Sequence, residues 1–165
     1  TIIAGLKRLD QTEVDFIAMP CNTAHLYFNE CQKNISIPLL NIVEETVKKI
    51  PEKRQRIVII ATTPTMESQL YQNEIRRAGH SIIEKKQWQA RVNKIIAWTK
   101  AGKKENAEKE WNKLLKEIKK EECTTIICAC TDITEIMQEI TKKMIGIDSS
   151  RALAEAVVRK WKEMQ

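Results

Sequence analysis

Hydrophobic and polar positions alternate along the chain in a way that predicts strands separated by helices. Apolar, largely β-branched runs at 14–19, 57–61 and 124–128 are typical of buried strands. Apolar residues spaced three or four positions apart predict amphipathic helices between these runs. Strands that alternate with helices predict an α/β fold with mainly parallel sheets flanked by helices. We expect further strands at 37–40, 81–83 and 144–147, and helices at 2–12, 23–33, 44–50, 67–78, 89–100, 104–121, 134–142 and 149–164.

Two similar turns, each carrying a cysteine, follow strands of this pattern. Residues 19–25 (Met-Pro-Cys-Asn-Thr-Ala-His) come after the first strand, and residues 129–132 (Ala-Cys-Thr-Asp) come after a strand far downstream. Ligands of open α/β sheets bind at the carboxyl ends of the strands, which is where Cys21 and Cys130 stand. Unpaired N–H groups at the start of a helix lower the pKa of a neighbouring thiol. These two elbows are therefore the strongest functional signal in the chain.

The repetition of the elbow also predicts two similar lobes with the active site between them. We expect one lobe to consist of residues 1–52 together with 148–165, and the second α/β lobe to span 53–147. The polar run at 52–56 is the best candidate for the connection between the lobes. The first lobe is expected to be incomplete, because the chain starts at Thr1 inside a predicted helix and we expect further residues upstream.

The net charge of +6 is concentrated in one stretch of the chain. Residues 85–122 contain 12 Lys and Arg against 6 Asp and Glu, whereas the remainder is neutral. Three tryptophans lie in the same stretch, so a nucleic-acid surface must be considered. However, the apolar residues of 107–118 recur at helical spacing, which predicts a core face with a solvated lysine face opposite. Because no motif of a known nucleic-acid module accompanies the charge, we expect no nucleic-acid partner.

Composition and cysteine usage indicate the cellular setting. The 165 residues are 42% hydrophobic, which is enough to bury a core. There is no apolar run of transmembrane length and no signal-peptide pattern, so we expect a cytoplasmic protein without a membrane partner. The five cysteines fall mostly in apolar or helical segments rather than in loops, which favours free thiols in a reducing compartment.

Three segments of the chain resemble motifs of the aspartate/glutamate racemase family. Residues 16–25 (Phe-Ile-Ala-Met-Pro-Cys-Asn-Thr-Ala-His) resemble its first catalytic motif. Residues 129–132 are similar to its second motif, which is usually Gly-Cys-Thr-Glu, and residues 61–65 (Ala-Thr-Thr-Pro-Thr) resemble its Ala-Thr-x-Gly-Thr loop. The order and spacing of the three segments also fit, so the similarity runs over nearly the whole chain.

The resemblance implies a racemase of aspartate or glutamate that needs neither pyridoxal phosphate nor any other cofactor or metal. Racemisation removes the α-proton from one face of the amino acid and returns a proton to the other face, so two acid–base groups are required. Cys21 and Cys130 are the implied pair, with sulfurs roughly 7–9 Å apart, because two donor distances of about 3–3.5 Å must bracket one carbon. Donors around the α-carboxylate would stabilise the carbanion. The implied substrate-binding residues are Asn22, Thr23, Thr62, Thr63, Thr131 and Asp132.

His25 lies about one helical turn beyond Cys21 and is a candidate for tuning the pKa of that thiol. An ordinary capping or surface histidine is an equal alternative. The predicted helix after Cys21 is expected to use Asn22 or Thr23 as its N-cap. The resemblance further implies a small acidic amino acid as the binding partner, and we expect a homodimer.

The chain departs from the family pattern at three places. The family begins with a strand and a Gly-rich loop, often Gly-Gly-Met-Gly-Pro, and nothing before Thr1 supplies it here. Asp132 is one methylene shorter than the usual Glu, and Pro64 stands where the family has Gly. The first difference bears on activity and the other two bear on the choice of substrate.

Three alternatives remain beside the racemase interpretation. The main one is a non-catalytic relative that binds an acidic amino acid or dicarboxylate. A second is another carbon-acid isomerase or a decarboxylase that acts on a dicarboxylate. A zinc site of Cys21, His25, Cys128 and Cys130 is a weaker alternative, because we expect the side chains of Cys128 and Cys130 to point to opposite faces of their strand.

Overall fold

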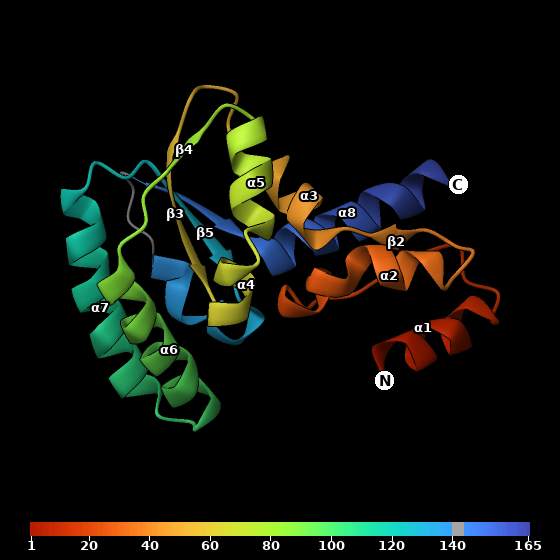
Figure 1. Cartoon of the computed structure of the whole chain (residues 1–165), viewed down its shortest axis with the longest axis horizontal. Helices are drawn as coiled ribbons and strands as arrows, with labels where there is room; N and C mark the ends of the chain where they lie inside the picture. The colour runs from red at the N-terminus through yellow and green to blue at the C-terminus, as the bar shows by residue number, and fades with distance from the viewer. Residues whose placement is uncertain (140–143) are drawn as a thin grey trace.

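The protein is an α/β structure with two parallel sheets flanked by helices, as the sequence pattern predicts (Figure 1). The computed structural model describes residues 1–139 and 144–165. Its larger sheet has four strands in the order β4-β3-β5-β6, and its smaller sheet pairs β1 with β2. Every pair of neighbouring strands is parallel. The strands are β1 (Ile17–Ala18), β2 (Leu39–Leu40), β3 (Arg56–Ala61), β4 (Ser81–Ile82), β5 (Thr125–Ala129) and β6 (Ile145–Asp148).

The central strands β3 and β5 are buried on both faces, which explains their unbroken apolar sequences. They pair along five residues, from Ile57 opposite Thr125 to Ala61 opposite Ala129. This register aligns the carboxyl ends of the two strands. The residues that follow them, Thr62 and Cys130, therefore leave the sheet side by side.

Helices cover both faces of the larger sheet. The helices α6 (Lys86–Lys100) and α7 (Lys104–Lys120) pack on the face that carries Val58, Ile60 and Ile126. The opposite face carries Ile57, Ile59, Ala61, Ile127 and Ala129, and it packs against three other helices. These are α3 (Ile42–Val47), α5 (Leu70–Arg77) and α8 (Ser149–Glu163).

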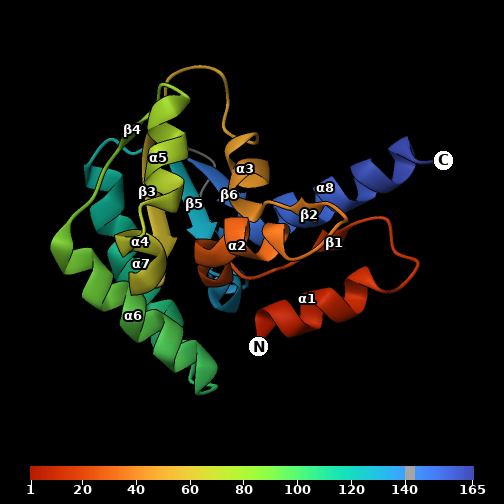
Figure 2. The ribbon, with the colours of Figure 1, turned by 45° about the vertical axis from the view of Figure 1, so that its right-hand side comes forward.

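The smaller sheet has a separate apolar cluster. The helices α1 (Ile2–Asp10) and α2 (Phe28–Lys33) lie beside it, and α1 stands apart from the larger sheet (Figure 2). Apolar side chains from the two helices, the two strands and the loop between α2 and β2 form this cluster: Leu6, Ile17, Cys31, Ile35 and Leu39.

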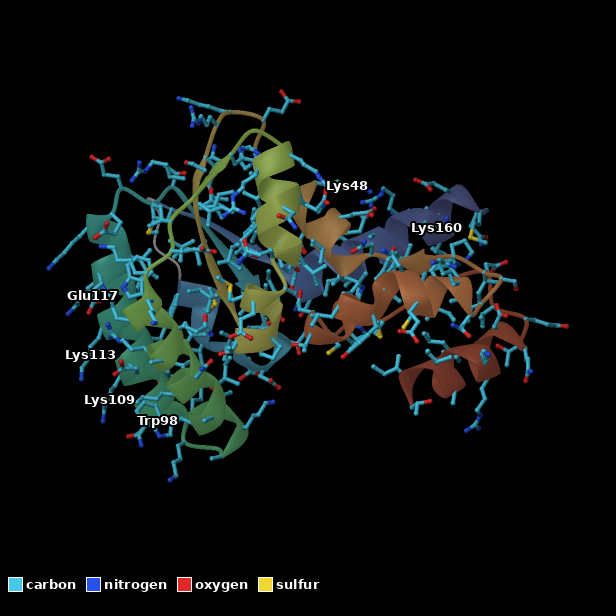
Figure 3. The ribbon with its side chains drawn as sticks, viewed as in Figure 1. Lys48, Trp98, Lys109, Lys113, Glu117 and Lys160 are labelled. Atoms are coloured by element: carbon cyan, nitrogen blue, oxygen red, sulfur yellow. The ribbon has the colours of Figure 1, made fainter. Side chains whose placement is uncertain are left out.

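The helix α7 has the amphipathic pattern that the sequence predicts. Its residues Ala107, Trp111, Leu114, Leu115 and Ile118 are all buried. Its lysines, such as Lys109 and Lys113, are exposed and lie on the outer side of the helix (Figure 3). The expected solvated lysine face of this helix is therefore confirmed.

Several predicted elements are shorter or divided. The strand predicted at 14–19 is only two residues long, because β1 has a single partner strand of two residues. The helix predicted at 67–78 is α5, which starts only at Leu70 because Gln69, with a φ of 57° in the left-handed region, separates it from the short helix α4 (Thr63–Glu67). The closing helix is capped by Asp148, whose side chain accepts from the Ser150 N–H.

The segments after both elbows start as 3₁₀ helices, not as the α-helices that we expected. Thr23–Tyr27 is a 3₁₀ helix that leads into α2, and Asn22 stands at its N-cap position without a side-chain cap. After the second elbow, Thr131–Ile133 and Ile136–Glu139 are 3₁₀ helices. The rest of the helix predicted at 134–142 lies outside the described residues. A lowered thiol pKa therefore cannot be attributed to an α-helix dipole at either elbow.

One apolar cluster spans the two predicted lobes. It joins Ile42 and Leu153, which we assigned to the first lobe, to Ile57 and Ile127 of the second. The division of the chain into lobes at 1–52 plus 148–165 and at 53–147 stays a prediction. Within the part of the chain that the structure describes, no helix is both long and apolar enough to cross a bilayer.

Candidate active site

The first elbow exposes Cys21 and holds its backbone through a buried histidine. The side chain of His25 is only 1% exposed. Its Nε2 accepts from the Ile42 N–H at 3.2 Å, so Nδ1 carries the proton and donates to the Cys21 carbonyl at 2.8 Å. Burial lowers the pKa of His25, which keeps the ring neutral. His25 thus fixes the backbone of the elbow through the Cys21 carbonyl, and its two ring nitrogens bond to backbone groups rather than to the thiol. The prediction that His25 tunes the pKa of the Cys21 thiol stays a prediction.

Asn22 is buried beneath the elbow and ties it to two other segments. The Asn22 amide donates to Ser149 Oγ at 3.0 Å and accepts from the Tyr71 hydroxyl at 2.5 Å. Ser149 begins α8 and Tyr71 lies in α5, so this amide fastens the elbow to two helices of the larger sheet. The side chain that we predicted to bind substrate is 3% exposed and is occupied by protein partners.

Three threonine hydroxyls connect the first elbow to the loop after β3. Thr23 Oγ1 lies 2.9 Å from Thr62 Oγ1 and 3.1 Å from Thr65 Oγ1, and Thr62 and Thr65 are 3.0 Å apart. Each hydroxyl has one proton but two lone pairs, so a closed ring of three uses all three protons and leaves one lone pair on each member; that of Thr62 accepts from the Thr65 N–H. The structure thus brings together two predicted substrate-binding residues, Thr23 and Thr62. It adds Thr65, which the sequence analysis did not place in the site.

The second elbow holds Cys130 in a chain of polar contacts. The Cys130 thiol is 3.8 Å from Asp132 Oδ2, and the same carboxylate oxygen lies 3.1 Å from Lys100 Nζ. Burial raises the pKa of the Cys130 thiol, the charge of Asp132 raises it further, and the Lys100 ammonium opposes the increase. A hydrogen bond with the Asp132 backbone also lowers the pKa of this thiol, so the backbone and the lysine both favour the thiolate.

Lys100 is a site residue that the sequence analysis missed. Its pKa is raised mainly by the hydrogen bond and charge of Asp132, with smaller contributions from Cys130 and from Cys21. The ammonium group reaches the Cys130 thiol through the Asp132 carboxylate, which contacts both. It belongs to the lysine-rich stretch that we interpreted as a solvated face, and its place as the last residue of α6, before the Ala-Gly turn, was the only available signal.

The two elbows meet through their neighbours. Thr62 and Cys130 follow the aligned ends of β3 and β5, and adjacent strands lie about 4.8 Å apart. Thr62 in turn contacts Thr23, two residues after Cys21. These contacts bring both elbows to one edge of the molecule. The distance of roughly 7–9 Å that we expect between the two sulfurs stays a prediction.

Two further predicted substrate-binding residues have different surroundings. Thr63 Oγ1 accepts from Asn93 Nδ2 at 2.9 Å, which ties it to α6 and away from the three-threonine ring. Thr131 is exposed beside Cys130 and is free to meet a ligand. Their roles toward a substrate stay predictions.

The four residues of the zinc alternative do not share the arrangement that we expected. Cys128 and Cys130 lie on the same face of β5, within one apolar cluster, because residues two positions apart on a strand point the same way. Our expectation of opposite faces was wrong. Cys128 is deeply buried, and burial raises the pKa of its thiol to about 12. Both ring nitrogens of His25 are held by backbone groups, and no three potential ligands converge among the described residues.

Comparison with known proteins supports one family. The family model for Asp/Glu/hydantoin racemases matches residues 1–157. The chain is 41% identical over 158 residues to the broad specificity amino-acid racemase RacX of Bacillus subtilis, covering 95% of this chain and 69% of that protein. It is 30% identical over 152 residues to the glutamate racemase of Aquifex aeolicus, covering 87% of this chain and 58% of that protein.

A solved structure agrees with both sequence matches. The aspartate racemase of Picrophilus torridus superposes with a TM-score of 0.82 at 26% identity, covering 96% of this chain and 67% of that one. All three relatives carry the names of amino-acid racemases. The sequence motifs, the parallel α/β fold and these similarities lead to one conclusion: the chain belongs to the Asp/Glu/hydantoin racemase family.

Proposed function

We propose that the protein is a cofactor-independent racemase of aspartate or glutamate that uses Cys21 and Cys130 as its two acid–base groups. The observation that supports the proposal is that the Thr23–Thr62 contact and the aligned ends of β3 and β5 bring the two cysteine elbows together, with the Lys100–Asp132 pair beside Cys130. The chain spans only part of its relatives, at 69% of one and 58% of another. The activity is therefore proposed for the whole protein that contains these residues.

The chemistry requires one thiolate and one thiol on opposite faces of the α-carbon. The thiolate removes the α-proton, so that a C–H bond breaks and an S–H bond forms. The opposite thiol then gives its proton to the carbanion from the other face, which inverts the stereocentre and leaves that sulfur as the thiolate. Cys21 and Cys130 exchange these roles when the reaction runs in the other direction.

The negative charge of an acidic substrate makes Lys100 a candidate binding residue. The Lys100 side chain is 61% exposed and is paired with Asp132, whose side chain is 38% exposed. A substrate carboxylate that reaches this pair would gain a charge-assisted hydrogen bond. The same ammonium favours the Cys130 thiolate, so substrate binding and base strength depend on one side chain. The hydroxyls of Thr23 and Thr62 are the proposed donors to the α-carboxylate as negative charge develops, and each would turn its proton from the three-threonine ring toward the substrate.

The test is α-hydrogen exchange with deuterated solvent, measured by NMR, together with chiral chromatography of the product. No pyridoxal phosphate or metal is added. Because one relative is named a broad specificity racemase, the assay includes neutral and basic amino acids beside aspartate and glutamate. We expect Cys21→Ser and Cys130→Ser each to lower racemisation by at least about 10²-fold, since each direction needs both an acid and a base.

A matched control uses another cysteine near the same strand. Cys123 is buried two residues before β5, and its thiol donates to the Thr125 carbonyl, a bond that a serine hydroxyl can keep. Cys123→Ser should retain activity. If the protein binds acidic amino acids but exchanges no α-hydrogen, and both serine variants of the elbows bind equally well, the catalytic proposal fails. The protein would then be the non-catalytic binding relative.

A homodimer, a cytoplasmic location and the absence of a nucleic-acid partner remain predictions. Sedimentation of the purified protein measures the first of them. Salt-dependent binding of a DNA duplex measures the last, and a steep fall in affinity with salt would favour a binding role for the lysine-rich helices.

A further inference from the structure

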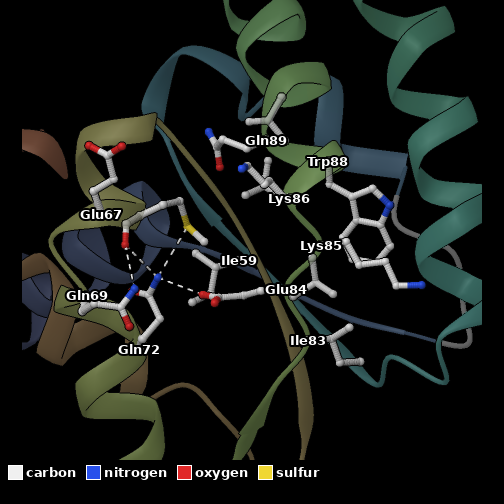
Figure 4. Close-up of a pocket in the computed structure, with 14 residues that line it drawn as sticks. Ile59, Glu67, Gln69, Gln72, Ile83, Glu84, Lys85, Lys86, Trp88 and Gln89 are labelled. Atoms are coloured by element: carbon white, nitrogen blue, oxygen red, sulfur yellow. Dashed lines mark hydrogen bonds between the residues drawn. The ribbon is translucent and has the colours of Figure 1, made fainter.

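A second pocket lies beside β3, away from the two cysteines. It has a volume of ≈ 330 Å³, within the range of about 300–1,000 Å³ typical of small-molecule sites. Figure 4 shows Gln69 and Gln72 on one side of it, Trp88 on the other and Ile59 between them. Neither elbow contributes a lining residue, so this pocket is distinct from the candidate active site.

The floor of the pocket is an edge of β3 that the sheet leaves open. The strand β4 ends after two residues, and its last contact with β3 is the Ile83 N–H donating to the Ile57 carbonyl at 2.8 Å. Alternate residues of a strand direct both backbone groups to the same edge, so Ile59 faces the same side as Ile57. The next such residue, Ala61, has its carbonyl satisfied by Gln89 Nε2 at 3.0 Å.

Ile59 is left between these two satisfied positions. Ile59 is 5% exposed, and β4 pairs with β3 only at Arg56 and Ile57. Among residues 1–139 and 144–165, no loop backbone group and no side chain donates to or accepts from Ile59 at this edge. Buried backbone groups without a partner are rare, because each costs about the free energy of a lost hydrogen bond. This edge therefore calls for an occupant that both donates and accepts.

A buried side chain beside the same pocket also has a polar atom without a hydrogen-bond partner. Gln72 is fully buried, and its Nε2 donates to the Met66 carbonyl at 3.0 Å and to Glu84 Oε1 at 3.0 Å. Both partners are acceptors, which fixes the orientation of the amide. Its Oε1 has no partner in the described part of the chain. The pocket thus offers the N–H and carbonyl of Ile59 in largely apolar walls, and the buried Gln72 amide lies behind one of these walls.

We propose that this pocket binds a neutral, planar cyclic amide of the purine-base type. The N–H and carbonyl of one extended residue lie close together and point the same way. A cyclic amide presents a neighbouring N–H and C=O in the plane of its ring, so both can pair with Ile59 at once. The apolar walls, which include Trp88, Ile83 and Val92, suit the ring faces. The rim carries Glu84 and Lys85, whose opposite charges favour no charged ligand.

The test compares hypoxanthine with 1-methylhypoxanthine by NMR titration of ¹⁵N-labelled protein. Hypoxanthine has the adjacent N–H and C=O, whereas the methyl group of its analogue replaces the donor and blocks approach to the strand edge. We expect hypoxanthine to shift the Ile59 amide resonance and to leave that of Ile127, an amide in the middle of paired β5, unchanged. The methylated analogue should bind about tenfold more weakly.

A pair of variants locates the binding. Ile83→Phe places a larger ring in the pocket and should abolish the shift, whereas Ala90→Phe on the exposed side of α6 should not. If hypoxanthine leaves Ile59 unmoved, the strand edge is satisfied by solvent alone and the proposal is wrong. Equal binding of the two purines, or equal binding by both variants, would also overturn it. None of these results depends on racemase activity.

Discussion

Removing the hydroxyl of Tyr71 should destabilise the protein by far more than the loss of one oxygen atom suggests. Tyr71 is fully buried, and burial raises the pKa of its phenol, so the hydroxyl stays protonated and serves as a donor. It donates to the Asn22 amide oxygen, which is itself buried beneath the first elbow. Tyr71→Phe leaves that oxygen without its donor in a place that water does not reach.

The magnitude follows from this burial. A buried acceptor left without a donor costs about 1–3 kcal/mol of stability, whereas the loss of a hydrogen bond whose partner water can replace costs only about 0.5–1.5 kcal/mol. For a chain of 165 residues, about 2 kcal/mol corresponds to a fall of about 4–8 °C in Tm. Urea unfolding followed by circular dichroism measures the free energy of unfolding directly, provided that the slope of the transition stays unchanged.

Tyr27→Phe is the matched control, because Tyr27 is 58% exposed. This substitution should change the free energy of unfolding by less than about 0.5 kcal/mol. A double-mutant cycle with Asn22→Ala then isolates the contact: the effects of Tyr71→Phe and Asn22→Ala should fall short of additivity by about 1 kcal/mol or more. If Tyr71→Phe costs no more than Tyr27→Phe, or if the two effects add, the amide does not depend on this hydroxyl and the reasoning is refuted.

Three further predictions concern titration. Lys100→Met should move the pH midpoint of Cys130 alkylation upward, because the ammonium opposes the rise in the thiol pKa. Asp132→Asn should move this midpoint downward, since the carboxylate raises the pKa of the Cys130 thiol. Iodoacetamide labelling with mass spectrometry measures the midpoint of each variant. Midpoints identical to that of the unchanged protein would contradict the contacts of Cys130 with Asp132 and Lys100. Burial lowers the pKa of His25 in the folded protein below its ordinary 6.5. The contribution of neutral His25 to the free energy of unfolding is therefore complete above pH 6.5, and it is lost as the pH falls through the pKa of the folded state, because the unfolded chain binds the proton first. The urea midpoint of His25→Gln should therefore depend less on pH in that window than that of a His80→Gln control, and equal slopes would disprove this.

The parts of the fold that the sequence predicted are those in which local pattern and burial agree. The run at 57–61 is apolar throughout because β3 lies between two layers of helices, so its composition identifies it without knowledge of its neighbours. The helix α7 buries the apolar face that its spacing indicates. In both cases the residues of the element itself are enough to identify it as a strand or a helix.

The parts that the sequence did not predict depend on contacts between distant segments. The length of β1 is limited by β2, its only partner strand in the described structure, and an apolar run does not reveal how far its neighbour extends. Gln69 adopts a left-handed conformation that nothing in its residue type requires. The three-threonine ring joins residues about forty positions apart, and it could not be read from spacing. Lys100 was missed for the same reason, because its partner Asp132 lies on another element.

Pro64 links the family pattern to the chemistry of this chain. Proline in the first turn of a helix is favourable, since its missing N–H would have no partner there and its φ is already helical. The structure places Pro64 in the first turn of α4, after a Thr62 cap whose hydroxyl accepts from the Thr65 N–H at 3.5 Å. At this position the resemblance gives glycine, whose N–H and small size allow a ligand to approach the backbone closely. Here that N–H is absent, so under the proposed function polar recognition by this loop would rest on the hydroxyls of Thr62 and Thr65. A hydroxyl can both donate and accept, whereas a backbone N–H only donates. A loop that recognises its ligand in this way is less restricted to carboxylate oxygens, which is a physical reason to include neutral amino acids among the substrates tested.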